Sequence, residues 1–249
     1  MPGATTISDD AFSGCTNLAS VAMPGATTIG LSAFANCTGL ASVAMPSATT
    51  IDMSAFSSCT ALTSVAMPKV GTIGDCAFAS CTSLASVEMP KVTSIGDRAF
   101  DSCKALTTIE LPKATTINYM AFYGCTALTS INMPEATTIG EDAFRGCLVL
   151  TSAKMPNVTT IGKYAFRNCE KLESVEIPNV TEIGEKAFYL ALKLTSLTLG
   201  ATPPTVGTDA FARHATTTRN LIIQGNTAYQ TEALAAYNTA AGNDGNATD

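Results

Sequence analysis

The phenylalanines of this chain recur every 22 residues over most of its length. Nine of them, from Phe12 to Phe188, keep this interval, and the tenth, Phe211, comes one residue late. Nine of the eleven prolines and eight of the nine cysteines follow the same period. A fixed period of this size is the signature of a repeat array. Each repeat in such an array packs only against its neighbours, so equivalent residues are expected to form columns along a stack.

The residue pattern of each repeat predicts two short strands, a turn and a helical turn. Residues 108–111 alternate between polar and apolar, which predicts a strand, and Pro112 ends it because proline donates no backbone hydrogen bond. The Thr-Thr-Ile segment at 115–117 predicts a second short strand, since β-branched residues suit a pleated surface.

A turn and a helical segment are expected to complete the repeat. The position after the second strand holds Gly30, Gly74, Gly96, Gly140, Gly162 and Gly184, or a Ser, Asp or Asn, which indicates positive φ or an Asx-type turn. The Ala-Phe pair and the following cysteine, three residues after the phenylalanine, predict a short helical turn that presents Phe and Cys on one face.

The repeat resembles the BspA-type (treponemal) leucine-rich repeats. The pattern C-x-x-L-x-x-V-x-M-P-x-x-T-x-I-G-x-x-A-F appears here as Cys81, Leu84, Val87, Met89, Pro90, Thr93, Ile95, Gly96, Ala99 and Phe100. The resemblance covers roughly residues 1–240. It implies surface or secreted proteins of bacteria of the mouth and gut and of some mucosal protists, with roles in adhesion attributed to a few members.

The fold class that we predict is an α/β repeat solenoid, a right-handed leucine-rich-repeat stack of nine 22-residue coils over residues 1–198. Residues 199–242 are predicted to form a degenerate repeat and a cap, with a strand at 220–224 and a helix at 231–241, and 243–249 a disordered tail. The first coil has no counterpart to this cap, so Phe12, Leu18 and Val21 are expected to present an uncovered flank. Such an edge favours fraying or end-to-end pairing of two chains.

Composition and motifs exclude several functional classes. The net charge is −6 and no Lys or Arg precedes Lys69, whereas nucleic-acid binding needs clustered basic residues. Apolar runs are too short to span a membrane. His214 is the one histidine of the sequence, and no nucleophile, phosphate-binding or zinc-protease motif occurs. We therefore expect no enzymatic activity, no cofactor and no metal.

The cysteine column allows three interpretations. Residues 22 apart lie along a line, whereas zinc ligands converge on one point. Neighbouring coils lie close enough for disulfides, but parallel side chains disfavour the dihedral angle that the S–S bond needs. Ala191 replaces cysteine in the ninth repeat, which favours a buried column of small apolar thiols. Cys76 lies outside the column and is interpreted as an exposed thiol, with a dimer-forming cysteine as the alternative.

Two surfaces are candidates for partner binding. One is the outward side of the main strands, which solenoids commonly present as a concave sheet; its polar positions are Ser86, Glu88, Thr108, Glu110, Ser130, Asn132, Lys154 and Glu176. The other is an outer-face aromatic patch of Tyr119, Tyr123, Tyr164 and Tyr189. For both surfaces the alternative is an ordinary solvated face.

The functional prediction is a non-enzymatic cell-surface or secreted protein that binds an extracellular protein or glycan of a host or of another microbe. The alternative is a structural spacer that displays a further domain. Neither nucleic acid nor membrane insertion is expected.

Overall fold

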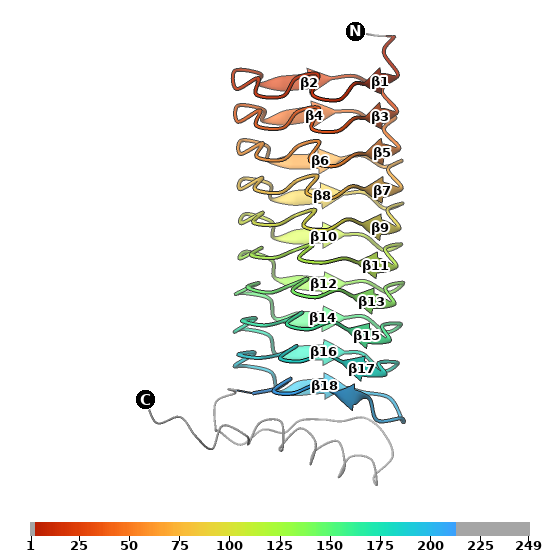
Figure 1. Cartoon of the computed structure of the whole chain (residues 1–249), viewed down its shortest axis with the longest axis vertical. Coiled ribbons are helices and arrows are strands. Elements are labelled where there is room, and N and C mark those ends of the chain that lie inside the picture. The colour runs from red at the N-terminus through yellow and green to blue at the C-terminus, as the bar shows by residue number, and fades with distance from the viewer. Residues whose placement is uncertain (1–2, 213–249) are drawn as a thin grey trace, which may run out of the picture.

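The computed structural model describes residues 3–212 and shows a stack of coils, each coil being one lap of the chain (Figure 1). Every coil contributes a two-residue strand, and nine contribute a three-residue strand. The two-residue strands are β1 (Thr6–Ile7), β3 (Thr28–Ile29), β5 (Thr50–Ile51), β7 (Thr72–Ile73), β9 (Ser94–Ile95), β11 (Thr116–Ile117), β13 (Thr138–Ile139), β15 (Thr160–Ile161), β17 (Glu182–Ile183) and β19 (Thr205–Val206). The three-residue strands are β2 (Ser20–Ala22), β4 (Ser42–Ala44), β6 (Ser64–Ala66), β8 (Ser86–Glu88), β10 (Thr108–Glu110), β12 (Ser130–Asn132), β14 (Ser152–Lys154), β16 (Ser174–Glu176) and β18 (Ser196–Thr198).

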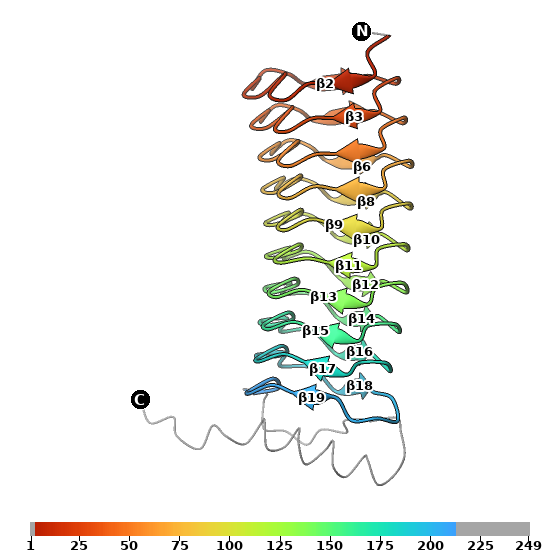
Figure 2. The same ribbon diagram turned by 45° about the vertical axis from the view of Figure 1, so that its right-hand side comes forward.

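The strands form parallel sheets in which each residue pairs with its repeat equivalent. The two-residue strands make one ten-stranded sheet that runs from β1 to β19, and Figure 1 labels its strands from β1 to β17 along one side of the stack. The three-residue strands make a second face, which is divided into β2–β4, β6–β8–β10 and β12–β14–β16–β18. Both views show a nearly straight stack, so the face that was expected to be concave is close to flat (Figures 1 and 2).

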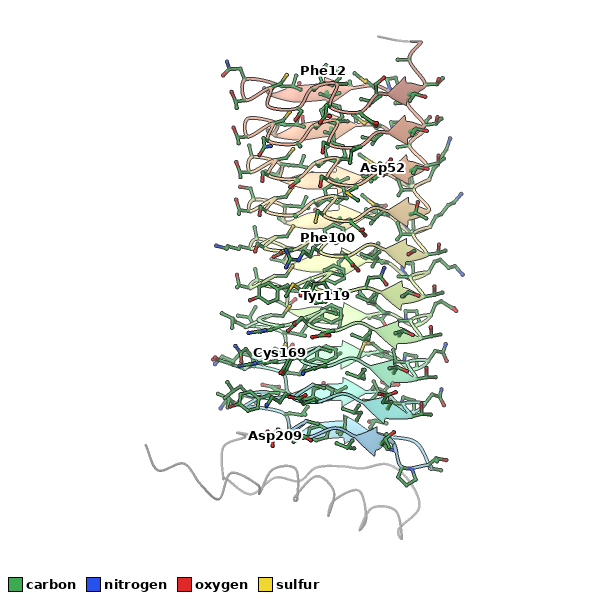
Figure 3. The ribbon with its side chains drawn as sticks, viewed as in Figure 1. Phe12, Asp52, Phe100, Tyr119, Cys169 and Asp209 are labelled. Atoms are coloured by element: carbon green, nitrogen blue, oxygen red, sulfur yellow. The ribbon has the colours of Figure 1, made fainter. Side chains whose placement is uncertain are left out.

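The core consists of the columns that the period predicts. Neighbouring phenylalanine rings stack with centroids 5.1 to 5.3 Å apart from Phe12 to Phe211, and Phe12 and Phe100 are labelled in Figure 3. Phe211 keeps its place although it comes one residue late, because β17 and β19 pair with a shift of 23 residues, Ile183 opposite Val206. The tenth coil therefore continues the stack as far as residue 212.

The predicted helical turn is wrong: residues 3–212 contain no helix, and so no helix that could cross a membrane. The segment between the strands is a series of tight turns. In the fifth coil the N–H groups of Ala99 and Asp101 donate to carbonyls three residues back, and those of Arg98 and Phe100 donate to the next coil at 2.8 Å. Arg98 has a positive φ of 55°, which interrupts any helical run. The predicted strand and helix of the cap lie outside the described residues.

The expectation of positive φ at the glycine column is also wrong. Positive φ occurs instead two and six residues later, for example at Ser32 and Asn36 after Gly30. In this column, a Cβ added to Gly140 would lie 2.7 Å from the carbonyl carbon of Asn118. These glycines therefore serve close approach between coils, although Asn118 shows that a side chain can be accommodated at this position.

The cysteine column is a row of buried free thiols, as predicted. All nine cysteines are free, and those from Cys37 to Cys169 in the column are buried, whereas Cys15 is exposed. Each of the seven buried thiols donates to the carbonyl oxygen of a phenylalanine 25 residues earlier, at 2.9 to 3.4 Å. Cys76 is half-buried and has a positive φ of 54°. The column is therefore a set of weak sulfur donors as well as small apolar side chains.

Burial in the first coil is incomplete. Phe12 and Leu18 are only partly buried, whereas Phe34 and Leu40 of the second coil are fully covered. Val21, which was expected to share the uncovered flank, is 8% exposed and counts as buried.

Candidate functional site

The face of three-residue strands is the first candidate binding surface. Its middle residues, such as Val87 and Ile109, point inward and are buried, and the residues on either side point outward. All eight predicted sheet residues lie at these outward positions: Ser86, Glu88, Thr108, Glu110, Ser130, Asn132, Lys154 and Glu176. The alternation of the strands thus brings them together on one face.

Charge is unevenly distributed on this face. Glu88 and Glu110 occupy paired positions in β8 and β10, so two like charges lie one coil apart. Lys154 and Glu176 are paired in β14 and β16, and their Nζ and Oε2 atoms lie 3.3 Å apart. Because these two side chains are 60% and 40% exposed, the ion pair contributes little to stability, and both groups are accessible to a ligand.

A hollow of about 320 Å³ lies at one of the breaks in this sheet. No strand pairing joins β10 to β12 within the described residues. The hollow is lined by Thr108, Ile109, Glu110, Leu111, Pro112, Ser130 and Asn132. The lining therefore combines hydroxyl, carboxylate and amide groups with the apolar side chains of Ile109, Leu111 and Pro112, a mixture that suits a ligand or a protruding side chain with both polar and apolar parts.

A second hollow of about 310 Å³ follows on β14, β16 and β18. Its lining includes Lys154, Glu176, Ser152, Ser174 and Ser196. Six of the eight predicted residues thus line the two hollows, whereas Ser86 and Glu88 line neither.

The four tyrosines do not form a simple aromatic patch. Each ring has a cationic side chain next to it: Arg98 lies 5.8 Å from the ring centroid of Tyr119, and Arg145 lies 5.6 Å from that of Tyr123. Arg167 lies 5.3 Å from the centroid of Tyr164 and 5.2 Å from that of Tyr189. Figure 3 shows large side chains crowding the turns of the lower coils.

The sequence analysis did not predict that arginines lie beside these tyrosines. Asp101, Tyr123, Arg145, Arg167 and Tyr189 each follow the buried phenylalanine of their own coil, so they form one column. Reading this column down the repeats would have found the arginines beside the tyrosines.

Ion pairs surround part of this cluster of tyrosines and arginines. The Glu185 carboxylate lies 2.9 Å from Lys163 Nζ and 3.3 Å from Lys186 Nζ, and Tyr164 Oη donates to it at 3.3 Å. The hydrogen bonds from the two lysines lower the pKa of Glu185 below its ordinary value. Arg145 forms a hydrogen bond with Asp142 at 3.2 Å.

Within residues 3–212 no group of three His, Cys, Asp or Glu side chains is placed to hold a metal ion. His214, the one histidine of the sequence, lies outside the described residues.

Comparisons with known proteins agree with the repeat pattern. The family model described as "BspA type Leucine rich repeat region" matches residues 5–118, 49–158 and 93–218. Among solved structures, the chain is similar to the leucine-rich repeat protein TpLRR of T. pallidum, with 28% identity, a TM-score of 0.58, and coverage of 70% of this chain and 82% of that one.

The chain is also similar to two further solved structures. A leucine-rich cell surface protein of Faecalibacterium prausnitzii is 30% identical over 71% of this chain and 64% of that one, with a TM-score of 0.46. A leucine-rich repeat protein of Bacteroides ovatus is 20% identical over 89% of this chain and 88% of that one, with a TM-score of 0.43. No curated protein matches the chain.

Proposed function

Because the chain belongs to the BspA-type leucine-rich repeat family, we propose that it is a non-enzymatic protein that binds an extracellular protein or glycan of a host or of another microbe. The binding surface in this proposal is the face of three-residue strands from β8 to β16. The proposed location is the cell surface or the extracellular space, which is supported by the description of the similar Faecalibacterium prausnitzii protein as a cell surface protein.

The observation that carries this proposal is the pair of hollows, each lined by polar and apolar groups, on one exposed sheet face. Outward positions there hold Glu110, Asn132, Lys154 and Glu176. Strand pairing fixes the backbone spacing of Asn132, Lys154 and Glu176, so little backbone freedom has to be lost on binding. A rigid surface with both charge signs and several hydroxyl groups suits a partner with complementary hydrogen-bonding groups.

A second candidate, a structural spacer, is favoured by the first three coils. Their outward positions are Ser20 and Ala22, and the same residue types recur in β4 and β6. Such small uncharged side chains offer few groups for recognition, so this end of the stack suits display of another part of the protein.

An array of immobilised extracellular-matrix proteins and glycans tests the proposal. The wild-type chain is compared with a triple charge reversal, Glu88→Lys, Glu110→Lys and Glu176→Lys. The matched control reverses three exposed acids elsewhere, Glu135, Glu170 and Glu182.

Binding that the sheet-face reversal abolishes and the control reversal retains supports the proposal. Equal binding by all three proteins contradicts the assignment of the face. No binding to any immobilised partner favours the spacer.

A further inference from the structure

The tight turns of coils 6 to 9 carry tyrosine and arginine side chains, which the face of three-residue strands lacks. We define the tyrosine–arginine edge as Tyr123, Arg145, Tyr164, Arg167 and Tyr189. All five side chains are half-buried. Backbone hydrogen bonds fix the spacing of Arg145 and Arg167, since the N–H of Gly146 donates to the Arg167 carbonyl at 2.9 Å.

Arg167 is the centre of this edge. Its guanidinium lies between Tyr164 of its own coil and Tyr189 of the next, 5.3 and 5.2 Å from the ring centroids. Cation–π contacts with both rings restrain the guanidinium and use none of its N–H donors.

The charge of Arg167 is not neutralised by a neighbouring acid. No ion pair joins it to any carboxylate in residues 3–212, because Asp142 contacts Arg145 and Glu185 contacts Lys163 and Lys186. Tyr164 Oη also donates to Glu185, which leaves that carboxylate surrounded by three donors.

Two polar atoms of this turn lack the hydrogen bonds that burial calls for. Arg167 Nε and Asn168 Oδ1 are both inaccessible and have no hydrogen-bond partner. Buried polar groups without partners are rare in folded proteins, and each calls for an explanation. Because Arg167 Nε is covered, a ligand must approach the guanidinium at its two Nη groups, which make no hydrogen bond within residues 3–212. A positioned arginine binds a carboxylate through two parallel N–H···O bonds, and the two Nη groups can donate both.

We propose that the tyrosine–arginine edge is a second docking surface, which binds an acidic segment of a partner protein with a carboxylate on Arg167. A protein partner fits better than a polysaccharide because tyrosine and arginine are the residues enriched at the centres of protein interfaces. The flanking rings of Tyr123 and Tyr189 would contact apolar side chains of the same segment. This surface is separate from the sheet face, so the two proposals can fail independently.

The first four coils provide an internal comparison. Their equivalents of Arg167 are Ser13, Ala35, Ser57 and Ala79, none of which can bind an anion in this way. Since the whole chain has a net charge of −6, general electrostatic attraction does not favour an acidic partner. Recognition must therefore come from the local arrangement of Arg167.

Fluorescence anisotropy with labelled peptides tests this proposal. The probes are a peptide of alternating glutamate and leucine and the same peptide with glutamine for glutamate, with a heparin fragment as the polysaccharide probe. The proteins are the wild type, Arg167→Ala, Arg167→Lys and the control Lys113→Ala, which removes the same charge from an exposed position on another part of the coil.

The wild type should bind the glutamate peptide about tenfold more tightly than the glutamine peptide, as expected for a charged hydrogen bond. Arg167→Ala should lose this preference, Arg167→Lys should lose most of it because lysine cannot form the planar fork, and Lys113→Ala should retain it. Unchanged thermal unfolding of Arg167→Lys shows that the loss is not due to misfolding.

Three outcomes would overturn the proposal. They are equal affinity of the wild type and Arg167→Ala for the glutamate peptide, no binding of either peptide, and binding of heparin alone with the same dependence on Arg167. The last outcome would assign the edge to an anionic polysaccharide.

Discussion

Raising the pH above 9 should destabilise this chain because six thiols of the cysteine column are held protonated. Burial is the main cause that raises the pKa of each of them above the ordinary value of 9.0; they are Cys59, Cys81, Cys103, Cys125, Cys147 and Cys169. In the unfolded chain the same thiols become free to ionise near pH 9.

The sign and size of the effect follow from proton linkage. Above pH 9 the folded state binds more protons than the unfolded state, so the free energy of unfolding falls as pH rises. At pH 9.0 each thiol lowers it by RT ln 2, about 0.4 kcal/mol, or about 2.5 kcal/mol for the six. At pH 9.5 the loss grows to about 5 kcal/mol, which is comparable with the whole stability of many domains.

Urea unfolding followed by circular dichroism, at pH 7.5 and at pH 9.0 under reducing conditions, measures this loss. The matched variant combines Cys103→Ala and Cys125→Ala, a replacement that Ala191 already provides in the ninth coil. Since four of the six thiols remain, its loss between the two pH values should fall to about 1.6 kcal/mol. The same loss in both proteins would refute the reasoning, because lysines and tyrosines would then be its source.

Further predictions concern the stack itself. Phe100→Ala should lower the free energy of unfolding by about 3–5 kcal/mol, since Phe100 is fully buried between two rings; a loss below about 1 kcal/mol in urea unfolding would contradict this. Gly140→Ala should lower the melting temperature because its Cβ meets backbone at 2.7 Å, whereas Gly71→Ala has open space and should not; equal melting temperatures would show that the coils can separate easily. Amide hydrogens near Phe12 should exchange faster than those near Phe100, because the first coil is only partly covered; uniform protection in a monomer would oppose this.

The period alone was sufficient to predict the columns and the strands. Phe12, Cys37 and Val21 lie where the 22-residue register puts them, because equivalent residues of adjacent coils must pair. The same register predicted that Glu88, Glu110 and Glu176 share one outward column. The position of a side chain that recurs once in every coil can be predicted from the sequence, because residues one repeat apart lie next to each other in the stack.

The backbone conformation of the turns could not be predicted from the period, and both the helical turn and the positive φ at the glycine column were wrong. Ala-Phe followed by Cys suits one turn of helix, but the N–H of Phe100 bonds to Ala121 of the next coil instead. Contacts between coils thus override the local preference. Likewise, the close approach at Gly140 depends on the neighbouring Asn118 backbone, which lies 22 residues away and leaves no local signature.

The hollow between β10 and β12 was not predictable either. The repeat predicts an uninterrupted sheet, yet strand pairing stops between Glu110 and Asn132 within the described residues. The position of the hollow therefore follows from the three-dimensional structure and not from the repeat pattern.

Hydrogen-exchange footprinting of the protein with a partner identified on the array tests the central claim most directly. The account predicts that bound partner slows exchange in peptides that contain β10 to β16, and that the Glu88→Lys, Glu110→Lys and Glu176→Lys variant shows no such slowing at the same partner concentration. Slowing confined to the ten-stranded sheet of two-residue strands, with exchange on β10 to β16 unchanged, would contradict it.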